Sequence, residues 1–371
     1  MSISTGYGQS LYYGDETKYG SAAQINQPIG LVQSVNPTES NDLFKIRTMG
    51  GTRDFNNIVP GKFEVTGSME FFLQHGSPLR MAIGEDSGTT SGQVDGGPRV
   101  YATEGGTTAY MHVMGSAASP ASLCFPSMTL EFADDKIGDC LGTSGAYNLN
   151  RKYTGVRVNS MTVSASVDEP LSVSMDWQAQ NVTISTAAAT SVGDLTVDPY
   201  VFYQGAVYAT SAEVSGTTTI SKDDAIAAVN SFDFTINNNL EPVWYIGGTT
   251  APHETLRGLK HLLPKGREYD ASLNLHFENK KMYEMFLGAV GAKSSQVVLG
   301  DYQIVMDFVR NGPIGAAASV NHDFMRIVLR NCKFEDINIT GSPEDIVSQT
   351  ISVFVRAAKV YFVDKDSNYR A

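Results

Sequence analysis

The chain has 371 residues, an apolar fraction of 42% and a formal net charge of −12 at pH 7. This length suits roughly two average domains, each able to bury a core. An acidic surface repels phosphate, which argues against a dedicated nucleic-acid binder and against an anionic membrane as a partner. Three cysteines without a C-x-x-C pair predict neither a disulfide framework nor a zinc site. We expect no signal peptide and no membrane span.

An internal repeat begins near the N-terminus. Residues 29–52 and 226–249 align without a gap at a constant offset of 197, and nine of the 24 positions are identical. The identical columns include Thr38, Asn41 and Gly50. A repeat of this kind predicts two copies of one structural unit.

The next element in each copy is a strand with strict alternation. Residues 61–71 and 267–277 carry apolar side chains at every second position, which predicts one buried and one wet face. This alignment places Phe63 opposite Tyr269 and Phe71 opposite Phe277. The predicted wet faces carry Glu64, Thr66, Ser68 and Glu70 in the first copy, and Asp270, Ser272, Asn274 and His276 in the second.

A short helix follows each alternating strand. In the first copy Ser77 is a candidate N-cap, Pro78 occupies the first turn and Gly84 can end the helix. In the second copy Asn279 can cap a helix that we expect to end at Gly291. Apolar residues at helical spacing in both segments indicate packing against a core.

Each half ends in a pair of predicted strands. Residues 156–167 and 171–182 flank a Pro-containing turn, and residues 327–340 and 346–360 do the same. The sequence therefore predicts a mainly β (α+β) fold, in which antiparallel sheet dominates two tandem domains with one short helix each. We place the first domain over residues 1–190 and the second over 191–371, with the Ala/Thr/Ser-rich segment 186–197 as the linker.

The halves differ by a large insertion in the first, over residues 85–150. It contains a predicted hairpin of residues 99–103 and 108–114, which turns at a Glu-Gly-Gly sequence. A second hairpin is predicted from residues 200–203 and 206–210.

No catalytic constellation emerges from the sequence. His253-Glu254 begins like a zinc-protease motif, but Arg257 stands where the second histidine is needed. The six histidines are dispersed, and no phosphate-binding loop or nucleophile elbow is present. We therefore predict no enzymatic activity, no catalytic residue, no metal and no cofactor.

The segment 231–249, the alternating strand that leads to Phe277 and the helix over 282–291 together resemble phage tail tube proteins. The resemblance covers most of both halves and implies small β-sandwich or half-barrel domains. In that family the inner strands of neighbouring domains form a continuous β-barrel ring, rings stack through a long loop, and genomic DNA passes through the bore. A chain with two such domains could form the ring from three copies with pseudo-six-fold symmetry.

The resemblance assigns roles to two sets of residues. The predicted wet faces become candidate lumen-facing residues, although the same side chains would also suit the outer, solvated face of a sheet. The loops 36–60 and 233–264 become candidates for contacts between stacked rings. Their representative residues are Asn36, Asn41, Gly50 and Gly51 in the first loop, and Asp233, Asn238, Gly247 and Gly248 in the second.

The implied partners are other copies of the chain, together with tape-measure, tail terminator and tail-tip proteins, and a sheath if the tail is contractile. DNA would pass without specific binding, and assembly would take place in the host cytoplasm before the protein resides in the virion tail. Two alternatives stay open at this point: a tube or hub component of another contractile injection machine, and a virion surface or adhesion module.

Overall fold

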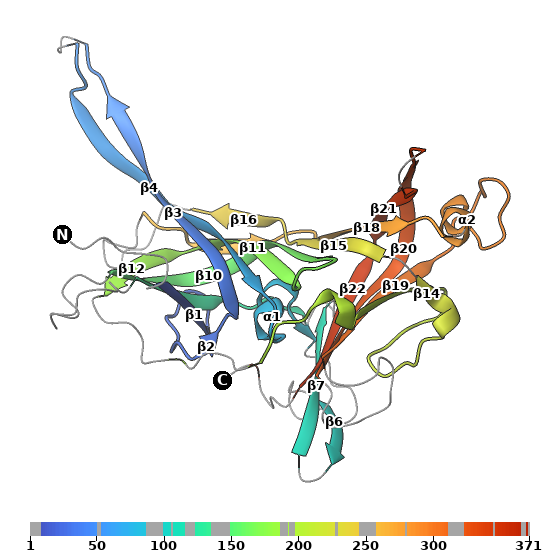
Figure 1. Cartoon of the computed structure of the whole chain (residues 1–371). Coiled ribbons are helices and arrows are strands. Elements are labelled where there is room, and N and C mark those ends of the chain that lie inside the picture. The colour runs from blue at the N-terminus through green and yellow to red at the C-terminus, as the bar shows by residue number, and fades with distance from the viewer. Residues whose placement is uncertain are drawn as a thin grey trace.

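The computed structural model of the chain consists mainly of strands, with two short α-helices among the described residues (Figure 1). The mainly β prediction is confirmed. The structure describes residues 9–49, 53–86, 99–104, 107–115, 123–134, 149–185, 192, 197–226, 229–244, 257–278, 280–310, 323–343, 346–364 and 369.

One long antiparallel sheet runs through the whole molecule. Four strands of the first half are followed by four of the second, and the joint between the halves is an antiparallel pair that spans Ser160↔Asn237 to Ser166↔Ser231. The strand order is β3 (Leu31–Ile46), β4 (Asn57–Phe72), β11 (Ser172–Ala179), β10 (Leu149–Ser166), β15 (Val229–Asn237), β18 (Glu268–His276), β21 (Ser348–Val355) and β20 (Phe324–Thr340).

A smaller sheet packs beneath each half of the long one. Strands β10 and β20 each belong to both layers, with the amino-terminal part in the small sheet and the carboxyl-terminal part in the long one, which connects the layers covalently. The first small sheet contains β2 (Gln27–Pro28), β1 (Gln9–Asp15), β9 (Met128–Asp134), β10 and β12 (Asn181–Ser185). The second contains β14 (Ala225–Ile226), β13 (Gly205–Thr210), β19 (Tyr302–Val309), β20 and β22 (Ala357–Asp364).

The two halves thus repeat the same order of pairing. The repeat extends to irregularities, because β3 and β15 each shift register against their partner at matching positions, near Gln33 and Asn230. The structure corrects one detail of the sequence alignment. Met69 and Leu273 occupy equivalent places, since each pairs with the equivalent residue of the next strand, Met175 or Ile351. The predicted alignment of β4 with β18 was therefore shifted by two residues. Because side chains alternate with a period of two along a strand, the assignment of faces is unchanged.

The main core fills the space between the layers of both halves. Its largest fully buried side chain is Trp177 of β11, which packs against Tyr153 with ring centroids 5.1 Å apart. Gly67 of β4 faces this indole, and a Cβ at that position would lie 2.3 Å from the Trp177 ring. The strand therefore needs a glycine there so that the aromatic ring can lie against its backbone.

The start of the first helix and the end of the second differ from prediction. Helix α1 (Ser77–Ile83) has Gly76, not Ser77, at its N-cap, and ends at Gly84 with φ 79° as predicted. Helix α2 (Lys281–Leu287) ends at Gly288 with φ 124°, so the predicted end at Gly291 was wrong. The first glycine able to adopt positive φ ended the helix. The predicted cap Asn279 lies outside the described residues.

The insertion adds strands to the small sheet of the other half. Its predicted hairpin is confirmed as β6 (Arg99–Glu104) and β7 (Thr107–Gly115), and β7 pairs with β22. Short strands β5 (Glu85–Asp86) and β8 (Leu123–Cys124) lie beside it. The second predicted hairpin was wrong. Residues Phe202–Gln204 form a 3-10 turn, and β13 pairs with β14 and β19 instead, because a longer and more buried strand was available as a partner.

The predicted loop 36–60 is mostly strand. β3 and β4 continue past the body of the sheet as one long two-stranded arm, the blue projection in Figure 1. In the second half the described pairing is shorter, with β16 (Leu240–Val243) paired to β17 (His261–Pro264). Another 3-10 turn, Lys222–Asp224, precedes β14.

Candidate assembly surface

The predicted wet residues all lie on the face of the long sheet opposite the core. Glu64, Glu70 and Asp270 are exposed, and the rest of the predicted set is half-buried. The set comprises Glu64, Thr66, Ser68 and Glu70 on β4 and Asp270, Ser272, Asn274 and His276 on β18. Because β18 and β4 lie in one continuous sheet, the two predicted groups belong to a single surface.

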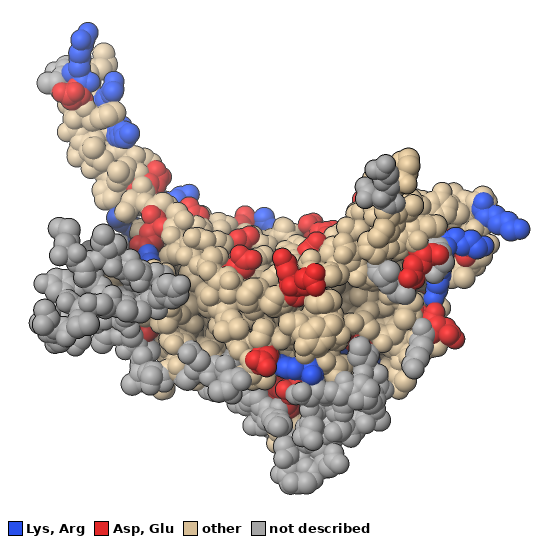
Figure 2. All heavy atoms as spheres, viewed as in Figure 1, with Lys and Arg blue, Asp and Glu red and all other residues tan. Residues whose placement is uncertain are grey.

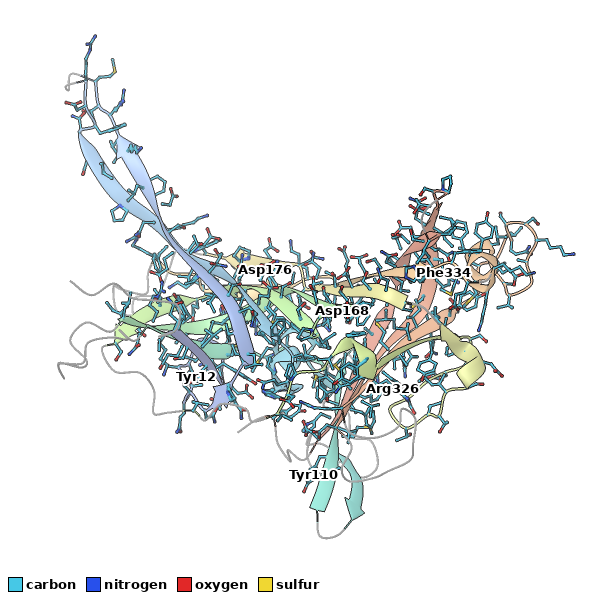
Figure 3. All side chains as sticks on the ribbon, viewed as in Figure 1. Tyr12, Tyr110, Asp168, Asp176, Arg326 and Phe334 are labelled. Atoms are coloured by element: carbon cyan, nitrogen blue, oxygen red, sulfur yellow. The ribbon has the colours of Figure 1, made fainter. Side chains whose placement is uncertain are left out.

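Hydroxyl, amide and carboxylate groups dominate this polar face. Across the joint between the halves, Ser164 Oγ donates to Asp233 Oδ1 at 2.6 Å, and the hydroxyls of Thr162 and Thr235 lie 3.0 Å apart. Asp176 points from the same face (Figure 3). Figure 2 shows carboxylates along the hollow between the arm and the far end of the sheet, and basic residues near the arm's tip.

The long sheet has two open edges. Strand β3 pairs only with β4, and the carboxyl-terminal part of β20 pairs only with β21, within the residues that the structure describes. Pro37 lies in the middle of β3, opposite Gly67, and has no N–H to offer. Prolines are tolerated at sheet edges and protect them from indiscriminate pairing.

Asn238 fastens the two halves together at the joint. Its side chain is 1% exposed, and its Nδ2 donates to the carbonyl oxygens of Ala82 at 2.9 Å and Val158 at 3.0 Å. Its backbone N–H donates to Asn159 O at 2.7 Å, while Oδ1 accepts from Arg267 Nε at 2.8 Å. Asn238 does lie in the loop between β15 and β16, but its side chain is fully engaged inside the chain and is not free for a contact with a stacked ring.

The remaining residues assigned to stacking loops fall into three groups. Asn36 is an exposed residue of β3 in the body of the sheet, Asn41 is an exposed residue of β3 at the start of the arm, and Asp233 is an exposed residue of β15 on the polar face, so none of the three is in a loop. Asn41 Oδ1 accepts from Arg257 Nη2 at 2.7 Å. The glycines of the set, Gly50, Gly51, Gly247 and Gly248, lie outside the described residues.

The arm exposes large apolar side chains beyond the body of the sheet. Met49 is fully exposed, Phe44 is 56% exposed, and Leu43, Ile46, Phe55, Ile58 and Val59 are also exposed. Arg47 lies over the Phe55 ring, 4.5 Å from its centroid. Exposed apolar side chains gathered on one projection favour a site of protein–protein contact. Sequence periodicity missed it, because charged residues such as Lys45 and Arg47 interrupt the apolar residues of the arm.

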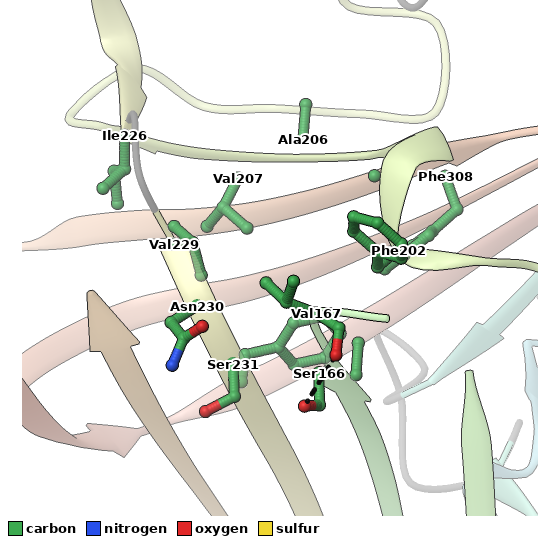
Figure 4. A pocket seen from close by; sticks show the side chains of 13 residues that line it. Ser166, Val167, Phe202, Ala206, Val207, Ile226, Val229, Asn230, Ser231 and Phe308 are labelled. Atoms are coloured by element: carbon green, nitrogen blue, oxygen red, sulfur yellow. Dashed lines mark hydrogen bonds between the residues drawn. The ribbon is translucent and has the colours of Figure 1, made fainter. Parts of the chain in front are cut away.

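An apolar cavity of about 230 Å³ lies beside the joint, between β13, β15 and the end of β10 (Figure 4). Phe202, Val207, Ile226, Val229 and Phe308 form much of its wall. No cluster of three or more potential metal ligands occurs in the part of the chain that is described. Among the described helices, none is long and apolar enough to cross a membrane.

Two titratable side chains away from the polar face, His75 and Cys332, have pKa values that burial shifts strongly. Burial lowers the pKa of His75 to about 4, so its ring is neutral at pH 7. Burial raises the pKa of the Cys332 thiol to about 12, which keeps this free cysteine in its unreactive form. Both shifts reflect packing rather than an arrangement of reacting groups.

A sheet with a polar face, two open edges and an apolar arm defines a structural protein that is built for assembly. A family model described as phage tail tube protein matches residues 6–353, nearly the whole chain. The chain therefore belongs to the phage tail tube protein family, a family of structural proteins of the virion tail. A comparison with curated proteins found no match.

Proposed function

We propose that three copies of this chain close head to tail into a ring, that rings stack into the tail tube, and that phage DNA passes through its bore. The observation that carries the proposal is the joint inside the chain. There β10, the last sheet strand of the first half, pairs with β15, the first strand of the second half. The open edges, β20 and β3, are the repeat equivalents of these two strands. Pairing them between chains repeats the same contact and leaves no open edge.

The internal joint also specifies a register for the contact between chains. Strand β10 maps onto β20 through their pairing with β11 and β21, and β15 maps onto β3 through the sequence repeat. The Thr162–Thr235 pair then corresponds to Asn338 of one chain opposite Thr38 of the next. The Ser164–Asp233 pair corresponds in the same way to Thr340 opposite Asn36. Each of these pairs joins groups that can hydrogen-bond across an antiparallel ladder.

The polar face would line the bore of such a ring. Its hydroxyls, amides and carboxylates, among them Glu70, Asp176 and Asp233, offer a polyanion little to bind. Neutralising phosphates with Lys and Arg supplies most non-specific DNA affinity. A wall with the opposite charge lets DNA slide past, as delivery through a tube requires.

Stacking of rings is assigned to the arm. Its apolar residues Leu43, Phe44 and Ile46 would be covered by the next ring, because a two-stranded hairpin is not stable alone in water. The tape-measure, terminator and tail-tip proteins, with a sheath in a contractile tail, complete the proposed partners. Assembly in the host cytoplasm belongs to the same proposal, as does the division into domains 1–190 and 191–371.

Electron microscopy and mass measurement test the ring directly. Concentrated protein should form hollow tubes or six-lobed rings that contain three chains. A Thr38→Cys/Asn338→Cys double variant should form disulfide-linked oligomers under mild oxidation, whereas each single variant should not. Rings with another number of chains, or assemblies without this cross-link, would contradict the proposed closure.

A further inference from the structure

The contact that fastens the internal joint has a counterpart on the outer edge of the chain. Asn41 occupies the same column of the repeat as Asn238. The backbone breaks regularity at the next residue in both places: the β3–β4 register shifts between Asn41 and Leu43, and Asn239 has φ 47°. Both asparagines also accept a hydrogen bond from an arginine at Oδ1, Asn41 from Arg257 and Asn238 from Arg267.

The difference between the two asparagines lies in what their Nδ2 atoms reach. Asn238 is buried because the end of α1 and the bulge of β10 belong to the same chain and cover it. Asn41 is exposed on the open β3 edge. An exposed asparagine with the backbone setting of a buried one suggests a surface that is completed by a partner.

The hydrogen-bond acceptors that Asn238 uses also have counterparts in the second half. Helices α1 and α2 end at equivalent glycines, Gly84 and Gly288, so Ala82 corresponds to Phe286. Strand β10 has its register shift between Val158 and Ser160, and β20 has one between Phe334 and Asp336. Val158 therefore corresponds to Phe334, and Asn159 to Glu335.

We propose that Asn41 of each chain latches onto the next chain in the ring, with its Nδ2 donating to the carbonyl oxygens of Phe286 and Phe334. The backbone N–H of Asn41 donates to Glu335 O in the same contact. This inference rests on the proposed ring and names the side chain that fixes its register.

Glu335 has a second part in the latch. Inside the chain, Leu240 N–H donates to Asn159 Oδ1 at 2.9 Å. The corresponding donor on the outer edge is Leu43 N–H, and the corresponding acceptor is the carboxylate of Glu335, which is exposed in the free chain. A carboxylate accepts from a backbone N–H at least as strongly as an amide oxygen does.

Burial of the two helices agrees with this contact. Every residue of α1 is buried, whereas α2 buries only Met282, Glu284 and Met285 and leaves Tyr283 41% exposed. The end of α1 is covered by Asn238 and by Arg267, which donates to Ile83 O at 2.8 Å. The counterpart of that carbonyl, Leu287 O, already accepts from Gln296 N–H at 2.8 Å. At the end of α2 the backbone of Gln296 thus takes the place that Arg267 has at the end of α1. The carbonyl of Phe286, the counterpart of Ala82 O, is left for a neighbouring chain.

The test compares assembly with folding in full-length variants. Asn41→Asp keeps the acceptor for Arg257 but removes the Nδ2 donor. It should raise the protein concentration needed for ring formation about tenfold or more, since loss of a buried hydrogen bond changes an association constant by this order. Thermal unfolding of the free chain should stay at the wild-type temperature. Asn274→Ala, on the polar face and away from both edges, is the matched control and should assemble as wild type.

A reciprocal pair of variants tests the other side of the latch. Glu335→Ala should impair assembly, whereas Glu335→Gln should preserve it, because glutamine keeps the acceptor oxygen. In a double-mutant cycle, Asn41→Asp and Glu335→Ala should be less than additive. Wild-type assembly by Asn41→Asp would overturn the latch and leave the proposed ring standing. Failure of the wild-type chain to form any ring would refute the ring and the latch together.

Discussion

Replacing Asn238 with alanine should be among the most destabilising single changes in this chain. The side chain donates to Ala82 O and Val158 O and accepts from Arg267. Loss of a hydrogen bond costs about 1 kcal/mol between neutral groups and about 1.5–3 kcal/mol when one group is charged. The carbonyls would stay buried without this donor, so we expect the free energy of unfolding to fall by about 3–5 kcal/mol.

Urea unfolding of the free chain, followed by tryptophan fluorescence, measures this loss. The matched control is Asn274→Ala, because Asn274 is half-buried on the polar face and should change the unfolding free energy by less than about 0.5 kcal/mol. A loss below about 1 kcal/mol for Asn238→Ala would show that the joint is held by strand pairing alone and that the asparagine contacts are incidental.

Three further changes test the core. Asp307→Ala leaves the guanidinium of Arg326 buried without the carboxylate that lies 2.7 Å from its Nε, and should cost about 3–5 kcal/mol by urea unfolding; a change below 1 kcal/mol would contradict this. Gly67→Ala drives a methyl group into the Trp177 ring and should cost about 1–3 kcal/mol, with a shifted tryptophan emission as the signature of displacement. The pKa of His75 falls from 6.5 to about 4 on folding, so the unfolded chain binds the extra proton. Stability should therefore decrease as pH falls from about 6.5 towards 4, by about 1–2 kcal/mol for this partly exposed ring, and His75→Gln should remove that part of the pH dependence.

Alternation was the most informative signal in the sequence. It placed Glu64 and Asp270 on the face away from the core, and it survived the alignment error because a slip of one full period preserves the face. It did not fix the register, because several apolar residues in each strand fit the buried positions equally well. The pairing of Met69 with Met175 depends on a strand that is distant in sequence.

Where the structure differs from the expectations from sequence, the common cause is contacts between residues that are distant in sequence. Asn238 is polar and follows a strand, which favours an exposed loop, yet three partners distant in sequence satisfy it in the interior. The arm was predicted as a loop because Pro37 and the charged residues around Phe44 obscure any period. Local sequence also could not show that β13 would prefer β19 to a hairpin partner close by.

The β6–β7 hairpin belongs to the first half only, and it projects on the side away from the polar face (Figure 1). In the proposed ring it would therefore stand on the outer wall three times rather than six. A binding protein that recognises this hairpin would meet the tube with three-fold stoichiometry. One that contacts only features shared by both halves could bind six times. The duplication thus allows a bore with pseudo-six-fold symmetry and an exterior that partners can recognise with three-fold symmetry.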